Sequence, residues 1–228
     1  MATSGTAAFN PDIAEICEDA FERCGLEMRS GYDLRTARRS LNIMSAEWSN
    51  RGLNLWTVAE GTLSITAGTA TYTLPSDTID LLEHVIRTGS GSTQSDQSLT
   101  RISGSTYATL TSKNSEGKPV QIYVDRQATP TVTLWPVPDS AATYTLVYWR
   151  IRRIEDVGAA ASNTYDAPSR FIPPLVAGLA YQIALKRPEV DLNRVALLKA
   201  AYEEQFTLAA DEDRSKASVQ FVPSISSV

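Results

Sequence analysis

His84, Cys17 and Cys24 are the side chains that could act as a general base, a nucleophile or a metal ligand. His84 is the only histidine, so a catalytic triad would depend on it, and no G-x-S-x-G motif accompanies it. A zinc site would need all three residues, but C-x-x-C and H-x-x-x-H spacings are absent. The pattern predicts a partly buried structural histidine and two buried cysteines that suit a reducing compartment.

Acidic side chains and glycines give no better sign of catalysis. Glu203, Glu204 and the acidic run 211–213 lie on or just past an amphipathic segment, where adjacent acids are typical of a solvated face. Glycoside hydrolysis needs a carboxyl group in an apolar pocket with a raised pKa. The phosphate-binding motifs G-x-G-x-x-G and G-x-x-x-x-G-K-[ST] are absent. We therefore expect a protein without enzyme activity, cofactor or metal.

Two clusters of arginines are candidates for contacts with other molecules. The cluster on a predicted helix consists of Arg38 and Arg39. The cluster at the end of a predicted strand consists of Arg150, Arg152 and Arg153. Basic residues beside aromatic ones, here Tyr148 and Trp149, can mark a nucleic-acid surface. The strand cluster is short, however, and Glu155 and Asp156 follow it. Ion pairing within a subunit or between subunits is the favoured interpretation for both clusters.

The composition excludes several classes of protein. The chain has 228 residues, a formal net charge of -5, 43% hydrophobic and 21% charged residues. Such values are ordinary for a folded protein and argue against a disordered chain. The acidic balance argues against a protein that grips duplex DNA, because a DNA-binding domain is usually basic. No apolar run approaches the ~20 residues of a membrane helix, and the first ten residues do not resemble a signal peptide.

Two helices are predicted near the start of the chain. The first begins after Asn10 as its cap, with Pro11 in its first turn, and stops at Gly25. The second carries an apolar stripe at spacings of three and four, made of Leu34, Ala37, Leu41, Met44 and Trp48. A one-sided stripe of this kind needs a partner helix.

The middle of the chain has the alternation of β-strands. Residues 62–74, interrupted at 67–69, predict a β-hairpin, and residues 79–87 are either a strand or a short helix. Residues 88–98 contain no apolar side chain and are interpreted as an exposed mobile loop. Further strands are predicted at 120–126, 131–135 and 143–151.

The strand at 143–151 is bulky on both sides. Tyr144, Leu146 and Tyr148 alternate with Thr145, Val147 and Trp149. We therefore expect both of its faces to be covered, by the core or by a neighbouring subunit.

Two more helices are predicted at the end, over residues 169–186 and 189–213. The last has an apolar stripe made of Leu192, Val195, Leu198, Tyr202, Phe206 and Ala209. The predicted fold class is α+β, with residues 1–55 and 156–213 as a helical platform and 56–155 as a β-rich insertion. Residues 214–228 have too few apolar side chains to fold alone, so they are either a free tail or a docking strap.

Residues 37–56, ARRSLNIMSAEWSNRGLNLW, resemble the second helix of phage head-to-tail adaptor (connector) proteins of the tail-tubular-protein-A-like family from short-tailed phages. In that family a helix with A-R-R-x-L-N closes at an R-G turn, and a tryptophan follows. The segments 61–75 and 80–83, and Phe171-Ile172 and 179–182 in the late helices, follow in the family's order. The resemblance extends over nearly the whole chain except residues 89–118.

The resemblance implies a structural virion protein of the neck, made in the host cytoplasm. Adaptors of this kind form a ring, typically twelvefold, that joins the portal to the tail nozzle. The ring lines the channel through which DNA leaves without specific binding. The resemblance also implies that the C-terminal tail docks to the portal, with Val219, Phe221 and Val222 as anchors. An acidic chain suits this role, because a basic lumen would retain the polyanion.

Two other functions remain open from the sequence. A tail or baseplate protein elsewhere in the virion would use the same β-sheet assembly. A cell-wall hydrolase that aids ejection would need an acid and a nucleophile in one cleft, and the sequence offers no such pair.

Overall fold

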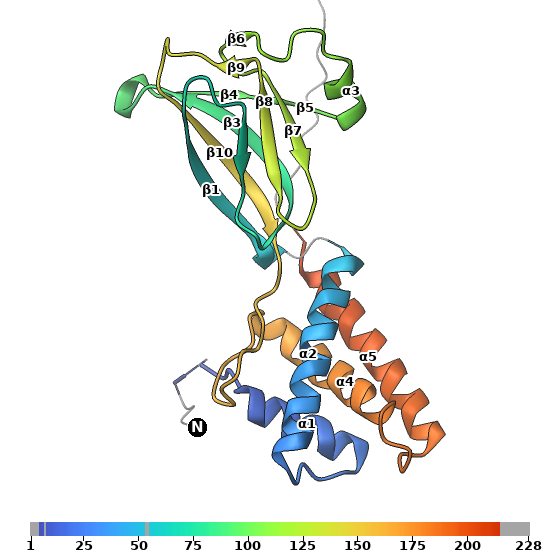
Figure 1. The fold of residues 1–228 in the computed structure, drawn as a ribbon. Coiled ribbons are helices and arrows are strands. Elements are labelled where there is room, and N and C mark those ends of the chain that lie inside the picture. The colour runs from blue at the N-terminus through green and yellow to red at the C-terminus, as the bar shows by residue number, and fades with distance from the viewer. Residues whose placement is uncertain (1–4, 7, 53–54, 215–228) are drawn as a thin grey trace, which may run out of the picture. The chain divides into compact units, whose positions relative to one another are not determined.

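The computed structural model describes residues 5, 6, 8–52 and 55–214. These residues form two compact units, whose elements are labelled in Figure 1. The helical unit comprises the described residues up to Ser45 and from Asp156 onward, and the β unit comprises Ala46–Glu155. The predicted α+β class is confirmed, with the sheets placed between N-terminal and C-terminal helices. The predicted division into a platform of residues 1–55 and 156–213, an insertion of residues 56–155 and a C-terminal tail stays a prediction.

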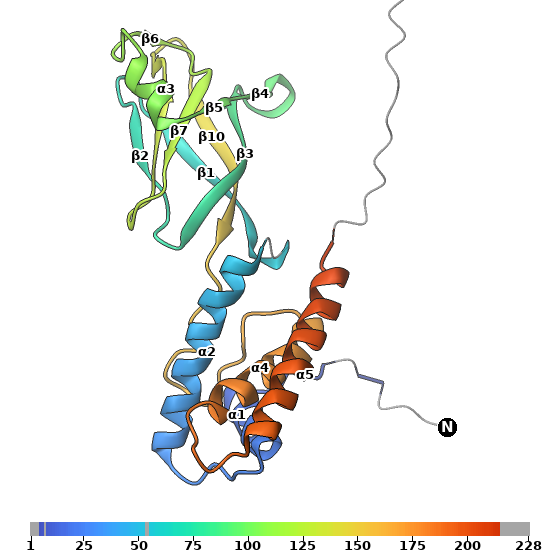
Figure 2. The same cartoon turned by 90° about the vertical axis from the view of Figure 1, so that its right-hand side faces the viewer.

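Helix α4 is the centre of the helical unit. The helical elements are α1 (Ile13–Cys24), α2 (Gly31–Arg51), η3 (Ser169–Phe171), α4 (Ile172–Ala184) and α5 (Leu192–Glu212). In both Figure 1 and Figure 2, α4 lies between α2 and α5. Gly178 makes this packing possible, since a Cβ atom there would lie 2.5 Å from Met44 Sδ and 2.7 Å from the Tyr202 ring. Nine of the thirteen residues of α4 are buried, in agreement with its central position.

Helix α1 begins at a different cap from the predicted one. Asp12, not Asn10, is the N-cap, because the Glu15 backbone N–H donates to the Asp12 carboxylate at 2.9 Å. In return the Asp12 backbone N–H donates to the Glu15 carboxylate at 2.9 Å, which completes a capping box. The end at Gly25 is as predicted, with φ of 76° at that glycine.

The two long helices bear out most of their predicted stripes. On α2, Ala37, Leu41, Met44 and Trp48 are buried and Leu34 is half-buried. On α5, the buried residues are Tyr202, Phe206 and Ala209. The prediction for Leu192 is wrong. It lies in the first turn, next to the N-cap Asp191, where no helix covers it, and it is largely exposed.

The β unit is a sandwich of two four-stranded sheets. Their strands are β1 (Val58–Ile65), β2 (Thr71–Thr73), β3 (Thr78–Thr88), β4 (Ser95–Ser98), β5 (Thr100–Ile102), β7 (Gln121–Asp125), β8 (Thr131–Trp135) and β10 (Tyr144–Arg152). One sheet has the order β1-β10-β3-β4 and the other β2-β8-β7-β5. Short elements complete the unit, namely η1 (Leu55–Thr57), η2 (Gly91–Thr93), α3 (Gly104–Thr109), β6 (Glu116–Gly117) and β9 (Val137–Pro138).

The predicted hairpin at 62–74 is wrong. β1 pairs with β10, and β2 pairs with β8, so the two strands lie in different sheets. The turn between them is a corner of the sandwich. The Tyr72 hydroxyl donates to the Thr66 carbonyl at 3.0 Å and accepts from the Thr66 N–H at 2.9 Å, while Gly68 N–H donates to the Pro138 carbonyl at 2.8 Å. These bonds direct the chain into the second sheet.

Residues 79–87 form a strand, which decides the alternative left open by the sequence. The prediction of a mobile loop at 88–98 is wrong for its second half, because residues 95–98 are β4, the edge strand beside β3. All four β4 side chains are exposed, as their polarity predicts. Backbone pairing and two bonds of 2.8 Å from Arg87 to Asp96 hold the strand, and neither depends on apolar burial.

The two faces of β10 are covered to different degrees. Tyr144, Leu146 and Tyr148 are buried in the sandwich core. On the other face Val147 is buried between its strand partners Thr62 and Val85, whereas Thr145 and Trp149 are half-buried. The prediction of two covered faces is confirmed for the core face and only in part for the other.

Candidate assembly surfaces

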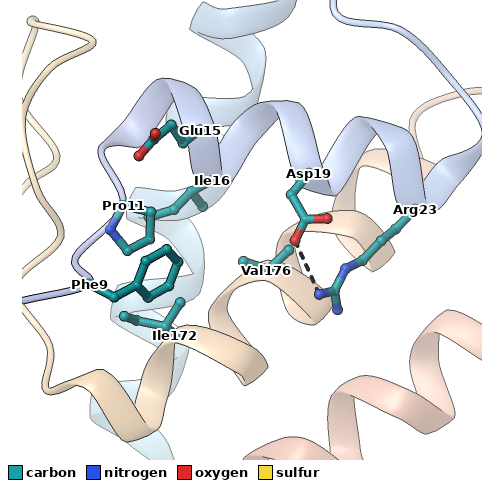
Figure 3. A pocket seen from close by; sticks show the side chains of 8 residues that line it. All are labelled: Phe9, Pro11, Glu15, Ile16, Asp19, Arg23, Ile172 and Val176. Atoms are coloured by element: carbon teal, nitrogen blue, oxygen red, sulfur yellow. Dashed lines mark hydrogen bonds and ion pairs between the residues drawn. The ribbon is translucent and has the colours of Figure 1, made fainter. Parts of the chain in front are cut away.

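A pocket of about 400 Å³ lies beside α1 and the start of α4. Figure 3 shows its lining, which is Phe9, Pro11, Glu15, Ile16, Asp19, Arg23, Ile172 and Val176. Its apolar residues come from the segment before α1 and from both helices. An Asp19–Arg23 ion pair of 3.1 Å borders it. The pocket has the chemistry to hold an apolar side chain with a charged neighbour, but it contains no catalytic pair.

The second pocket of the helical unit is organised around Asp33. This carboxylate accepts hydrogen bonds from the Arg29 and Ser30 backbone N–H groups and from the Ser30 hydroxyl, and it pairs with Arg187. Burial opposes its ionisation, but the hydrogen bonds from Ser30 and Arg187 outweigh burial and lower the pKa of Asp33. The group is thus a fixed anion that ties the start of α2 to the segment after α4.

The two thiols are unsuited to nucleophilic chemistry. Cys17 and Cys24 are both buried, and the Cys24 Sγ donates to the Ala180 carbonyl at 3.1 Å. Burial raises the pKa of Cys17 to about 12 and also raises the pKa of Cys24. A thiol must lose its proton to attack, so both are unreactive at neutral pH.

His84 lies on β3, inside the sandwich. Its side chain is buried, and among the described residues neither ring nitrogen has a hydrogen-bond partner. Burial lowers the pKa of His84, with the charge of Arg101 acting in the same direction. In the described part of the chain no three His, Cys, Asp or Glu residues are grouped to hold a metal ion.

The predicted arginine cluster on β10 bonds to its own chain. Arg150 pairs with Asp77 at 2.8 Å and donates to the Thr78 hydroxyl at 3.1 Å. Arg153 donates to the Ser76 carbonyl at 2.7 Å, and Arg152 to the Arg153 carbonyl at 3.2 Å. The structure thus brings Arg150 and Arg153 together at the turn before β3. A role of these three residues between subunits stays a prediction.

Arg38 and Arg39 point to different surroundings although they are adjacent. Arg38 is half-buried, and its Nε has no hydrogen-bond partner among the described residues. Arg39 is exposed, and its charge adds to the effect of burial in lowering the pKa of Lys186. Only Arg39 is therefore placed on an open surface. The predicted tail anchors Val219, Phe221 and Val222 lie outside the described residues.

Residues 12–223 match the family described as SU10 adaptor protein, which is most of the chain. The chain belongs to the SU10 adaptor protein family. Among curated proteins, no match to the chain was found. Membership confirms the predicted phage adaptor at the level of the family.

This adaptor is a structural bacteriophage protein of the virion neck. The family is one of structural adaptors, in agreement with the expectation of a protein that is not an enzyme. No helix of the described part is long and apolar enough to cross a membrane.

Sequence reasoning missed the apolar residues that the adaptor leaves exposed. The most exposed of them lie in the helical unit, on or beside its helices: Phe9, Tyr32, Ile43, Leu185, Leu192, Leu197 and Leu208. The sequence contains further apolar residues on the sides of α2 and α5 opposite the buried stripes. They could have been found, but only one stripe on each helix was considered.

Proposed function

We propose that this adaptor forms a ring, twelvefold as its resemblance to tail-tubular-protein-A-like adaptors implies, that joins the portal to the tail nozzle. The observation that carries the proposal is the exposure of large apolar side chains on outward sides of α2 and α5 in a member of an adaptor family. A single copy gains nothing from such exposure, whereas a ring of copies buries it. In this proposal the helical unit forms the ring wall.

The net charge supports a channel for passing DNA. Each subunit contributes a formal charge of -5. Phosphate contacts with Lys and Arg give strong, salt-dependent retention, so a lumen without a basic excess lets DNA pass. DNA is therefore a passenger of the ring and is not specifically bound.

The remaining parts have proposed partners. The tail from residue 214, with Val219, Phe221 and Val222, docks to the portal as a strap, repeated around the ring. The β unit contacts the nozzle or neighbouring copies. Arg38, Arg39, Arg150, Arg152 and Arg153 contribute pairs between subunits. The subunits are made in the host cytoplasm.

Particles that lack this protein test the proposal. A phage with the gene interrupted is expected to make DNA-filled heads without tails, and purified protein added to them is expected to restore tail attachment. Imaging of wild-type particles should show the protein between portal and nozzle. Its presence only at the distal tail or baseplate, or intact tails on the interrupted phage, would contradict the proposal.

Substitution of the tail anchors tests portal docking separately. Serine at Val219, Phe221 and Val222 together is expected to abolish binding to purified portal, because the strap loses its apolar contacts. The matched control replaces Ser224, Ser226 and Ser227 with alanine and should bind as the wild type does. Equal binding by both variants would exclude these anchors.

A further inference from the structure

Helix α2 carries an exposed row opposite its buried stripe. We define the α2 outer row as Tyr32, Arg39 and Ile43, with seven residues from the first to the second and four from the second to the third. Tyr32 is 66% exposed and Ile43 is 56% exposed. At 100° per residue the three lie on one side of the helix, and the buried Ala37, Leu41 and Met44 lie on the other.

Helix α5 carries a row with the same spacing. The α5 outer row is Leu197, Glu204 and Leu208, again with seven and then four residues between members. Leu197 is 71% exposed and Leu208 is 60% exposed. The row lies opposite Tyr202 and Phe206, which face the core. Each helix thus presents an apolar side chain, a charge and a second apolar side chain in the same order.

The central charges of the two rows are opposite. Arg39 and Glu204 are both exposed. Within the described part of the chain neither of them forms an ion pair, although many of its other charged residues do. A basic residue on one row and an acidic residue on the other can therefore meet only if the rows belong to different copies.

The arrangement of the helices allows that meeting. In Figure 1 and Figure 2 residues 31–45 of α2 and the whole of α5 run in the same direction, with α4 between them. Each outer row lies on the side of its own helix away from that helix's buried residues, so the two rows are different surfaces of one copy. A contact between two different surfaces is head-to-tail, and it forms a ring when the rotation between neighbouring copies closes. A rotation about an axis along the helices keeps neighbouring helices parallel.

We infer that copies of this adaptor join through the α2 outer row of one copy and the α5 outer row of the next. The helices pair in parallel, with Tyr32 beside Leu197, Arg39 beside Glu204 and Ile43 beside Leu208. The inference rests on the proposed ring and specifies its interface. Apolar pairs on both sides of the ion pair exclude water from it, and the charges fix the register.

Engineered cysteines test the register. In the full-length double variant Ile43→Cys, Leu208→Cys, mixed with the phage's portal protein and oxidised, we expect a ladder of disulfide-linked oligomers. The control pair Tyr32→Cys, Leu208→Cys is displaced by eleven residues, about 16 Å along a helix, and should give no ladder. The native cysteines are buried in both variants. If the single variant Ile43→Cys forms disulfide-linked dimers, two α2 helices meet in a symmetric contact, and the inference is overturned.

Charge reversal tests the central pair. Arg39→Glu and Glu204→Arg are each expected to weaken ring formation about tenfold or more, because like charges then meet, and the double reversal should restore it. The matched control is Lys199→Glu, an exposed charge reversal on α5 away from the row, which should assemble as the wild type does. Rings are counted by electron microscopy after addition of portal.

The proposed interface and the proposed function can fail separately. The wild-type protein could form rings on the portal while the Ile43→Cys, Leu208→Cys variant gives no disulfide ladder and the double charge reversal restores nothing. That result would overturn this interface and leave the proposed function standing. Wild-type protein that neither binds portal nor forms rings would overturn both.

Discussion

The helical unit and the β unit treat their large apolar side chains differently. In the β unit Leu55, Leu82 and Val120 are the most exposed of these, at 37–40%. On α2 and α5 the corresponding fractions are 56–83%. The sandwich therefore covers more of its large apolar side chains than these two helices do. We propose that the helical unit provides most of the contact between copies, and the following predictions test this difference between the units.

The largest effects should come from one glycine in each unit. A Cβ at Gly178 would lie 2.5 Å from Met44 Sδ, and a Cβ at Gly61 would lie 2.5 Å from the Tyr148 ring. Valine at either position should cost about 3 kcal/mol in the free energy of unfolding of its own unit, because the neighbouring ring cannot move freely.

Thermal unfolding of the two variants measures whether the units are independent. Gly178→Val should lower the transition of the helical unit and Gly61→Val that of the β unit. Gly31→Ala, with nothing within 4 Å of the new Cβ, is the control and should be neutral or stabilising. A single transition lowered equally by both valines would show that the units do not unfold separately.

The next effect concerns His84 and pH. Because burial lowers its pKa, His84 is neutral in the fold and binds protons more readily when unfolded. The β unit should therefore keep its full stability above pH ~6.5, the ordinary pKa of histidine, and lose stability as the pH falls below it.

His84→Leu should remove this dependence between pH 7 and pH 5. It should also stabilise the β unit at pH 7 by about 1 kcal/mol, since two buried nitrogens without partners disappear. Urea unfolding at both pH values measures the change. If the free energy of unfolding of the variant still falls from pH 7 to pH 5 as it does in the wild type, other groups cause the acid sensitivity.

The capping box of α1 should have a smaller effect. Asp12→Ala removes the carboxylate that accepts from Glu15 N–H and should cost the helical unit about 1 kcal/mol. Asp19→Ala on the same helix breaks only an exposed ion pair and should cost less. Urea unfolding of both variants ranks them, and the reverse order would contradict the assigned cap.

The smallest effect should come from the exposed pair between Arg87 and Asp96. Asp96→Asn removes its charge but leaves the backbone pairing of β3 and β4. Hydrogen exchange of the β4 amides should increase only slightly, and less still at high salt, where the wild-type pair is screened. Complete loss of amide protection would show that the pair, and not the backbone, holds the edge strand.

The sequence predicted what depends on local periodicity. The buried stripe of α2, the stop at Gly25 and the strands around 121–125, 131–135 and 144–152 all have patterns that span a few neighbouring residues. Prediction from the sequence failed where residues far away in the chain determine which strands pair. The residues after Gly68 leave β1 because Pro138 and β8 bind them, and β4 forms because β3 offers it a free edge.

The candidate surfaces were predicted less well than the fold. Arg39 was identified as a contact residue and is exposed, but Arg150 and Arg153 bond to a turn that lies far from them in the sequence. Tyr32, Leu197 and Leu208 were not identified, because an exposed apolar row is recognised only after the buried side of the helix is known. The pairing of the two outer rows also required the shared direction of α2 and α5.

A reconstruction of the phage neck, detailed enough to trace the helices, would show directly which helices of neighbouring copies meet. We expect a closed wall of helical units between portal and nozzle, with α2 of each copy against α5 of the next. Copies that touch one another only through their β units, with Tyr32 and Leu208 open to solvent, would contradict it.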